Sequence, residues 1–209
     1  MPGGTATVCS APDDVDGRRA RRGRNREAVV DALLDLFREG QLSPTAAAVA
    51  ERSGVSLRSV FRYFDDVDEM GRIAIERHAE TTRDLLPLPE LGIGDRATRI
   101  DALVKHRLRL YEHVAPVARA TLLRVPFQPV LADVMAERRD QLRDQLRRQL
   151  APELSALPAR ERSAIADAVD VMTSFESVEL LRVHRGLSVS ATTTVLTTAL
   201  NRLLAPRPA

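Results

Sequence analysis

The sequence AERSGVSLRSVFRYF, at residues 50–64, decides the fold class of this chain. The whole chain contains only two tyrosines, five phenylalanines and no tryptophan, yet three of these rings fall within residues 61–64. They are interleaved with arginine, since Arg58 and Arg62 belong to the same short stretch. Because polar and apolar positions recur at helical spacing on both sides of a glycine, the stretch predicts two short helices joined by a turn, a helix-turn-helix.

The predicted helix-turn-helix separates a small core from an outward face. Ala50 lies where the two helices cross, and Gly54 occupies the turn, where a positive φ is expected. The side chains that we expect to form the core are Val49, Ala50, Gly54, Val55, Val60, Phe61 and Phe64. The second helix is of a kind that fits the major groove, where arginine pairs with guanine and hydroxyls reach phosphates. Its predicted outward side chains are Ser56, Arg58, Ser59, Arg62 and Tyr63.

The basic excess of the chain is concentrated around this motif. The whole chain has 31 basic and 29 acidic residues, but residues 17–64 contain ten arginines and five acidic residues, a net charge of +5 (10 − 5). The arginines of residues 18–26 form a basic, arginine-rich arm that runs into a helix predicted from about residue 24 to 39. Arg22 and Arg24 are expected to lie on an unstructured or fraying part of this arm, where they can follow phosphates or enter the minor groove. This local excess points to a polyanionic partner. A surface helical hairpin in an arginine-rich chain is the simpler alternative.

Residues 24–78 resemble the N-terminal DNA-binding domain of the TetR family of transcriptional regulators. The residues that carry the resemblance are Ala32, Leu36, Phe37, Thr45, Val49, Ala50, and the segments 53–56 and 58–64. The resemblance implies an all-α homodimer that binds a palindromic operator in double-stranded DNA through this domain. It further implies a C-terminal domain that dimerises and binds a small-molecule effector. Thr45, at the start of the first motif helix, joins the residues expected to contact DNA.

The sequence departs from the family pattern at three places. Phe61 stands where the family usually has a tyrosine, and Val67 stands where it usually has a lysine at the start of the fourth helix. The first motif helix begins with three alanines, residues 46–48, and offers no basic side chain there. These departures remove phosphate contacts, so operator binding is expected to depend more on the arginine-rich arm.

The remaining chain also predicts helices, and the expected fold class is all-α. We expect a disordered leader over residues 1–17 and a DNA-binding domain over 18–70, with the helix at 66–86 as connector. Residues 87–209 are expected to form the C-terminal ligand-binding and dimerisation domain. Its predicted helices lie near residues 95–113, 115–124, 128–150, 159–184 and 188–204.

Two features of the C-terminal region suggest its roles. The predicted helices over residues 159–204 are apolar around much of their circumference, which favours a dimer interface. The alternative is that they are central helices of one bundle. The expected interface residues are Val171, Val178, Leu196 and Leu200. An apolar ligand pocket is expected to be bordered by Tyr111, Phe127, Met172 and Phe175, although plain core is the simpler interpretation of each residue.

Other classes of function find little support in the sequence. The single cysteine, Cys9, allows neither a disulfide framework nor a cysteine metal site, and the four histidines lack metal-ligand spacing. No nucleophile or phosphate-binding motif is present, so we expect no enzyme, no cofactor and no metal. No apolar run approaches a membrane span, and no signal peptide is recognisable, so a cytoplasmic protein is expected. The predicted function is a repressor released by its effector; the alternative is a constitutive dimeric DNA-binding protein.

Overall fold

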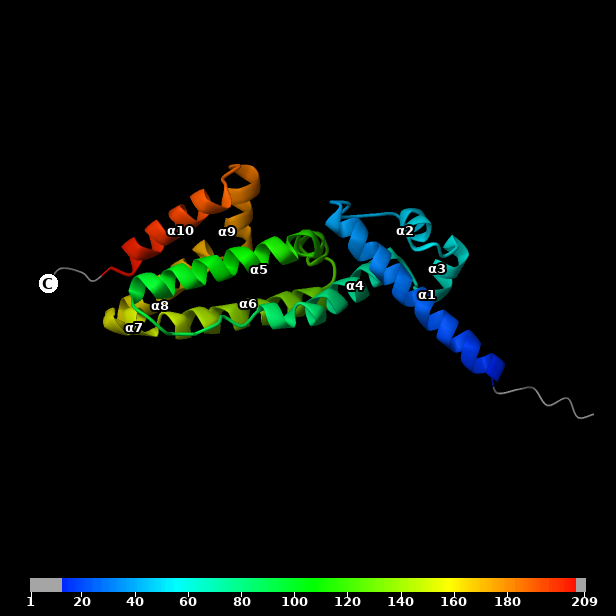
Figure 1. The fold of residues 1–209 in the computed structure, drawn as a ribbon, viewed down its shortest axis with the longest axis horizontal. Coiled ribbons are helices and arrows are strands. Elements are labelled where there is room, and N and C mark those ends of the chain that lie inside the picture. The colour runs from blue at the N-terminus through cyan, green and yellow to red at the C-terminus, as the bar shows by residue number, and fades with distance from the viewer. Residues whose placement is uncertain (1–12, 206–209) are drawn as a thin grey trace, which may run out of the picture. The chain divides into compact units, whose positions relative to one another are not determined.

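The computed structural model describes residues 13–205, and every regular element in that range is helical (Figure 1). The prediction of an all-α fold is therefore confirmed. None of these helices is both long and apolar enough to cross a lipid bilayer. In chain order the elements are α1 (Asp13–Arg38), α2 (Ala46–Ser53), α3 (Leu57–Tyr63), α4 (Val67–Thr81), η1 (Arg83–Leu85), α5 (Arg96–Arg124), α6 (Pro129–Gln149), α7 (Ala151–Ala156), α8 (Ala159–Met172), α9 (Phe175–Glu179), η2 (Leu180–His184) and α10 (Val189–Leu203).

The contacts within the chain divide it into two compact units, Met1–His78 (unit 1) and Ala79–Ala209 (unit 2). The division falls inside α4, eight residues beyond the end of the DNA-binding domain that the sequence predicts at residue 70. Unit 1 therefore contains the whole helix-turn-helix together with α1 and most of α4. Unit 2 contains the long helices α5 and α6 and the C-terminal helices.

Unit 1 is built around α1. Val29, Leu33 and Phe37 recur every four residues on one face of this helix, and all three are fully buried. Helix α2 makes its most extensive contacts with α1. At the surface, the guanidinium of Arg52 donates two hydrogen bonds of 2.7 Å to the carboxylate of Glu39, which joins α2 to the end of α1. The buried stripe and this ion pair hold the helix-turn-helix against α1.

Helix α1 begins earlier than the sequence predicts. Residues 1–12, most of the predicted disordered leader, lie outside the described residues. The chain is helical from Asp13 to Arg38, so the predicted helix start near residue 24 is wrong, and so is the prediction that Arg22 and Arg24 lie on an unstructured or fraying arm. The arginines of this arm belong to a continuous helix, whose contacts with α3 are described below.

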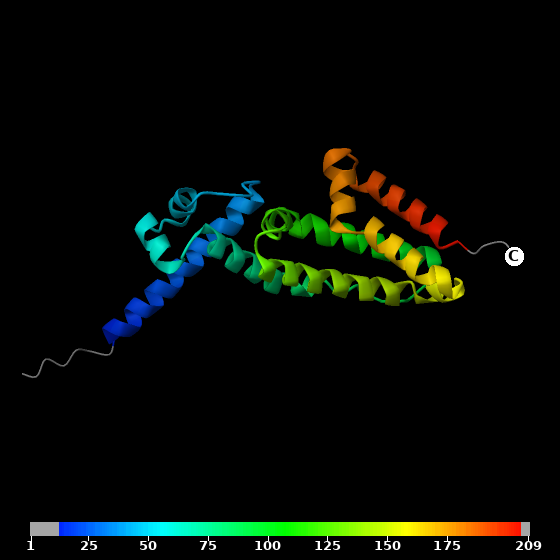
Figure 2. The same cartoon turned by 180° about the vertical axis from the view of Figure 1, so that it is seen from behind.

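Unit 2 is a helical bundle centred on α5 (Figures 1 and 2). Helix α10 packs against α5 more extensively than against any other helix. Leu146 and Leu150, at the end of α6, are fully buried in the same apolar core, together with Ile100 and Leu103 of α5. The core of unit 2 therefore lies between α5, α6 and the C-terminal helices.

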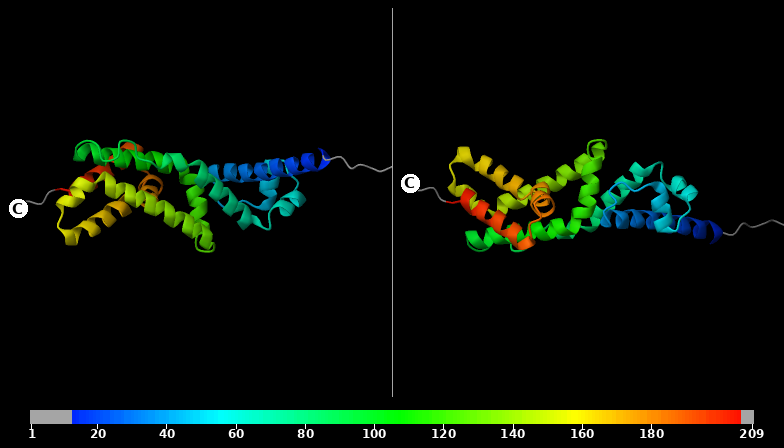
Figure 3. Two further views of the ribbon diagram at one scale, coloured as in Figure 1. Left: turned by 90° about the horizontal axis from the view of Figure 1, so that it is seen from below. Right: turned by 90° about the horizontal axis from the view of Figure 1, so that it is seen from above.

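Helix α5 is continuous where the sequence predicts two helices, 95–113 and 115–124. Pro116 lies inside the helix, and proline in a helix interior removes a hydrogen bond and bends the axis. Figure 3 shows that α5 changes direction in its C-terminal half, the part that contains this proline. The proline bends the helix instead of ending it.

The helix predicted over residues 159–184 is broken instead. Helix α8 ends at Met172, and α9 begins at Phe175 with Ser174 as its N-cap, where the Ser174 hydroxyl accepts a hydrogen bond from the Ser177 amide at 3.2 Å. A serine in extended backbone offers this cap in place of a further helical turn. The break therefore lies in the middle of the predicted dimerisation region.

Candidate nucleic-acid interface

The helix-turn-helix is fixed by caps at both of its helices. The Thr45 hydroxyl accepts a hydrogen bond from the Ala48 amide at 3.2 Å and so begins α2. Helix α2 ends at Gly54, whose φ of 67° lies in the left-handed region, where a β-carbon is costly. The Ser56 hydroxyl then accepts from the Ser59 amide at 3.3 Å and begins α3. Two short helices are thus held at a defined angle.

Helix α3 buries one face and exposes the other. Val60 and Phe64 are buried in unit 1, while Arg58 and Arg62 are exposed on the opposite side. Among the remaining predicted core positions, Val49 and Val55 are buried, Ala50 is partly buried, and Gly54 is exposed at the turn. The outward face is therefore formed by two arginines that a groove could receive.

The two aromatic side chains of α3 are placed opposite to the prediction. Phe61, predicted in the core, is 53% exposed, whereas Tyr63, predicted to point outward, is only 9% exposed. Tyr63 and Phe64 follow Val60 by three and four residues, which is the helical spacing of a single face. Phe61 falls beside the arginines instead. The prediction was wrong because the first phenylalanine of the stretch is one residue out of phase with the core.

Tyr63 joins α3 to α1. Its hydroxyl oxygen accepts a hydrogen bond from the side-chain amide nitrogen (Nδ2) of Asn25 at 3.3 Å and another from Nη2 of Arg62 at 3.1 Å. The guanidinium of Arg22 lies 5.9 Å from the centre of the Tyr63 ring, and that of Arg62 lies 5.1 Å from it. Such distances allow cation–π attraction. Tyr63 therefore gathers two arginines, one from each helix.

A second stacking contact continues along α1. Arg26 lies one turn after Arg22, and its guanidinium is 5.3 Å from the centre of the Phe64 ring. These contacts to α3 give a physical reason for the helical state of the arm. Arg24 is exposed on the same helix. We call Arg22, Arg26, Arg58 and Arg62 the arginine face of unit 1.

The outer part of this face is not neutralised within the described chain. No acidic side chain of residues 17–205 forms an ion pair with Arg58 or Arg62; the recorded side-chain partners of Arg62 are the hydroxyls of Ser59 and Tyr63. The acidic residues after α3 have other roles. The Asp66 carboxylate accepts from the Glu69 amide at 2.7 Å, and Glu69 accepts from the Asp65 amide at 2.6 Å, which caps α4. The charge of the arginine face thus remains available to an anion.

The two tyrosines of the chain should titrate in separate steps. Hydrogen bonds from Asn25 and Arg62 lower the pKa of Tyr63, because they stabilise the phenolate. Burial raises the pKa of Tyr111 to about 12. An ultraviolet titration of the folded protein is expected to show one tyrosine ionising below its ordinary range and the other well above it. Tyr63→Phe should remove the lower step alone; a single step at the ordinary tyrosine pKa would contradict these environments.

The residues predicted to border a ligand pocket do not share one environment. Tyr111 and Phe175 pack edge to face in the core of unit 2, with ring centres 5.6 Å apart, and the partly buried Met172 packs against the same apolar core. Phe127 is 83% exposed at the turn between α5 and α6, so its placement in a pocket is wrong. An apolar ring at an exposed helix connection cannot be recognised from composition.

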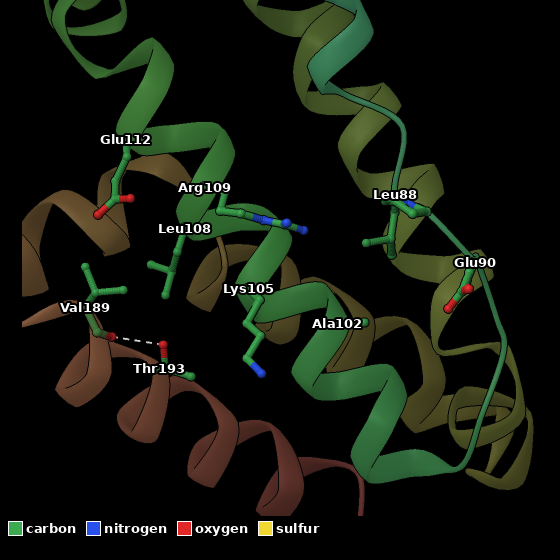
Figure 4. Close-up of a pocket in the computed structure, with 10 residues that line it drawn as sticks. Leu88, Glu90, Ala102, Lys105, Leu108, Arg109, Glu112, Val189 and Thr193 are labelled. Carbon is green, nitrogen blue, oxygen red and sulfur yellow. Dashed lines mark hydrogen bonds between the residues drawn. The ribbon is translucent and has the colours of Figure 1, made fainter.

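An open groove of about 340 Å³ lies elsewhere in unit 2 (Figure 4). It is formed by one face of α5, the start of α10 and the segment before α5. Figure 4 shows Lys105 and Arg109 of α5 beside this groove, with Arg109 extending toward the segment that carries Leu88 and Glu90. The groove is lined by charged and apolar groups together, and no sequence pattern pointed to it.

Three of the four predicted interface residues lie inside a single subunit. Val178, Leu196 and Leu200 are buried in the core of unit 2, where α10 packs on α5, so their assignment to an interface is wrong. Val171 is exposed. The exposed apolar side chains in this region, which we call the apolar C-terminal surface, are Val171, Leu180, Val183, Val189 and Val195. The helical stripe of α10 therefore belongs to its own subunit.

No cluster of three or more metal-ligating side chains occurs among the residues that the structure describes. No protein-family model and no curated protein matches the chain. The solved structures with a similar fold include two candidate regulators. A candidate transcriptional regulator from Pseudomonas aeruginosa PAO1 is 17% identical with a TM-score of 0.60, over 90% of this chain and 92% of that chain. A candidate fatty acid metabolism regulator from Clostridium perfringens is 14% identical with a TM-score of 0.55, over 87% and 99%.

Proposed function

We propose that this protein is a DNA-binding transcriptional regulator of the TetR type, which binds a palindromic operator as a homodimer. The observation that carries the proposal is the arginine face of unit 1. A capped α3 presents Arg58 and Arg62 outward, and the arginines of α1 are held beside it through Tyr63 and Phe64. The folds shared with two candidate regulators support the same conclusion.

The two parts of the arginine face have different roles in this proposal. Helix α3 enters the major groove, where the forked guanidinium of Arg58 meets the edge of a guanine. Thr45, Ser56 and Ser59 lie at the starts of α2 and α3 and can reach phosphates. Arg22 and Arg24, on α1, contact the phosphate backbone. Base contacts then specify the sequence, while phosphate contacts fix the position of the protein on the duplex.

Arg62 has a positioning role. Its Nη2 is held by the hydroxyls of Ser59 and Tyr63 at 3.4 and 3.1 Å, which restricts the guanidinium to the α1 side of α3. An arginine fixed in this way loses less side-chain freedom on binding. The buried Tyr63 therefore holds arginines of the arginine face in place, and it makes no direct contact with DNA in this proposal.

Dimerisation would use the apolar C-terminal surface. Five apolar side chains between residues 171 and 195 are exposed on α8, η2 and α10. Exposed apolar groups that gather in one region are typical of a protein–protein interface. A dimer would place two α3 helices about one duplex turn (~34 Å) apart, which matches a palindromic operator.

Val195→Glu is expected to weaken the dimer, because a carboxylate would be buried at the interface without a partner. We expect the dissociation constant to rise by roughly 10- to 100-fold, the equivalent of about 1.4–2.8 kcal/mol. Sedimentation equilibrium across a range of concentrations measures it. Gln141→Glu, at an exposed polar position of α6 outside the apolar C-terminal surface, is the matched control for a new charge. An unchanged monomer–dimer equilibrium for Val195→Glu would remove α10 from the interface.

Effector control completes the proposed function. Ligand binding in unit 2 would favour a separation of the α3 helices that no longer matches the operator, and effector and operator would weaken each other's binding reciprocally. The alternative is a constitutive DNA-binding protein in which unit 2 only dimerises.

One experiment tests the proposal and separates these two functions. Duplexes that the full-length protein selects from a random library are expected to share an inverted repeat. Ligands found by thermal stabilisation of the protein are then added to the selected complex. Release of the DNA supports effector control, whereas retention of the DNA with every stabilising ligand supports the constitutive alternative. Failure to enrich any sequence would contradict both.

A further inference from the structure

Arg107 of α5 is the most deeply buried charged side chain in the described part of unit 2, with 1% of its surface exposed. Its Nη2 donates a hydrogen bond of 2.6 Å to the backbone oxygen of Leu142. Its Nη1 has no hydrogen-bond partner within the described chain. The buried Arg99, on the same helix, is instead paired with the carboxylate of Glu153. Arg107 therefore lacks the anion that its buried neighbour has.

A buried and unpaired guanidinium is costly for the folded protein. Burial of a charge is tolerated when an opposite charge and hydrogen bonds compensate for the lost water. One carbonyl oxygen satisfies one donor only, while a guanidinium carries five N–H groups. The desolvation of Arg107 lowers its pKa, but an arginine stays protonated in proteins. The missing partner is therefore an anion that the described part of the chain does not supply.

The acidic residue of unit 2 whose charge reaches Arg107 is already engaged. The field of Asp170 acts on both Arg107 and Tyr111. However, the Asp170 carboxylate accepts a hydrogen bond from Nε of Arg143 at 3.2 Å, and that ion pair lies toward the surface of unit 2. Asp170 therefore forms no ion pair with Arg107.

The surroundings of Arg107 are suited to an apolar molecule with one anionic group. Tyr111 lies one helical turn further along α5, and its hydroxyl donates a hydrogen bond of 3.0 Å to the backbone oxygen of Thr173, at the break between α8 and α9. Phe175 packs edge to face on the tyrosine ring, and the partly buried Met172 packs against the same apolar core. Hydrogen bonds from the Thr173 hydroxyl to the Val169 oxygen at 2.8 Å and from the Ser177 hydroxyl to the Val171 oxygen at 2.6 Å also span this break. The break lacks the continuous backbone ladder of a helix and can therefore yield more easily than a continuous helix. The core next to Arg107 is thus apolar, and it borders the break between α8 and α9.

We propose that unit 2 binds an organic monocarboxylate whose carboxylate pairs with the Arg107 guanidinium, while its apolar body packs against Tyr111, Met172 and Phe175. The planar fork of arginine matches a carboxylate in two parallel hydrogen bonds. Entry of the ligand would break the hydrogen bond between Tyr111 and Thr173, and it would shift α8 relative to α9 at the break between them. The assignment of this carboxylate as the effector rests on the proposed function; the site itself does not.

The test is calorimetric titration of the full-length protein, without DNA, with octanoate, phenylacetate and benzoate. Octan-1-ol, 2-phenylethanol and benzyl alcohol serve as uncharged counterparts. We expect at least one carboxylate to bind tightly enough to measure and its alcohol to bind at least about tenfold more weakly, since a hydrogen-bonded charge pair contributes the equivalent of one to two decades in affinity. If none of the three carboxylates binds, the proposal is overturned.

Two variants locate the carboxylate. Arg107→Met should lose roughly 10- to 100-fold in affinity for the carboxylate, and it should unfold at a higher temperature, because an apolar side chain replaces a buried unpaired charge. Arg109→Met, on the same helix but beside the open groove, is the matched control and should bind normally. Loss of binding in Arg109→Met alone would place the anion in the groove and overturn the proposal.

A lower unfolding temperature for Arg107→Met, together with unchanged carboxylate binding, would show a purely structural arginine and would also overturn it. If Arg107→Met does not fold, Arg107→Lys keeps the charge without the fork and should bind at least about tenfold more weakly; unchanged binding would again contradict the site. Because these titrations contain no DNA, their failure leaves the proposed regulator intact. Binding without release of the operator would confirm the site and separate it from regulation.

Discussion

Arg58→Ala is expected to weaken binding to the operator by about 1–3 kcal/mol for each subunit, the discrimination that one bidentate base contact provides. Arg58 lies on the exposed side of α3, opposite the buried Val60, and α3 is held in place by the Ser56 cap. Removal of the guanidinium should leave the phosphate contacts of α1 intact. Affinity for unrelated DNA should therefore fall much less, so that the ratio of operator to unrelated affinity narrows.

The matched control is Arg24→Ala, which removes an exposed arginine from the helical arm. A phosphate contact is lost equally from every sequence, so affinity for both duplexes should fall together. The slope of log affinity against log salt should decrease by about one unit per contact in each subunit. Fluorescence anisotropy titrations on operator and scrambled duplexes at several salt concentrations measure both effects. If Arg58→Ala lost affinity equally on the two duplexes, Arg58 would be a phosphate contact.

Glu153→Ala should lower the free energy of unfolding of unit 2 by about 3–5 kcal/mol, because it leaves a buried arginine without its anion. Both members of the pair are buried. Nε of Arg99 lies 3.3 Å from Oε2 of Glu153, and Nη2 bonds the other carboxylate oxygen. The Arg99 guanidinium also bonds the backbone oxygen of Gly94. The ion pair therefore fixes α7 and the start of α5 together.

Urea unfolding followed by circular dichroism measures this loss. Glu176→Ala removes the partner of Arg139 in an exposed ion pair and should cost about 1 kcal/mol or less. A second variant with Arg99→Met added to Glu153→Ala should recover part of the stability, since no buried charge then remains. A loss for Glu153→Ala no larger than that of Glu176→Ala would show that water reaches Arg99.

The sequence contained enough information for the helix-turn-helix and for the all-α class. Gly54 and the two hydroxyl caps, Thr45 and Ser56, act locally, and local chemistry can be recognised from neighbouring residues. The periodicity of Val60 and Phe64 is likewise local. These features appear in the structure where the sequence predicts them.

Several errors arose where contacts between distant residues decide the outcome. The sequence gives no sign that Asn25 bonds Tyr63, 38 residues away, or that Arg26 stacks on Phe64, and these contacts accompany the helical arm. The apolar stripe of α10 looks the same whether α5 or a second subunit covers it. Likewise Arg107 is one arginine among many in the sequence, and only its burial distinguishes it.

The central claim is that a dimer inserts two α3 helices into successive major grooves of its operator. Hydroxyl-radical and methylation-protection footprinting of the full-length protein on a selected duplex tests it most directly. We predict two protected guanine-containing half-sites on one face of the DNA, with centres one helical turn, about 10–10.5 base pairs, apart or at a whole multiple of that spacing. Arg58→Ala should abolish guanine protection in both half-sites. A uniform footprint without discrete half-sites, or guanine protection that persists in Arg58→Ala, would contradict the claim.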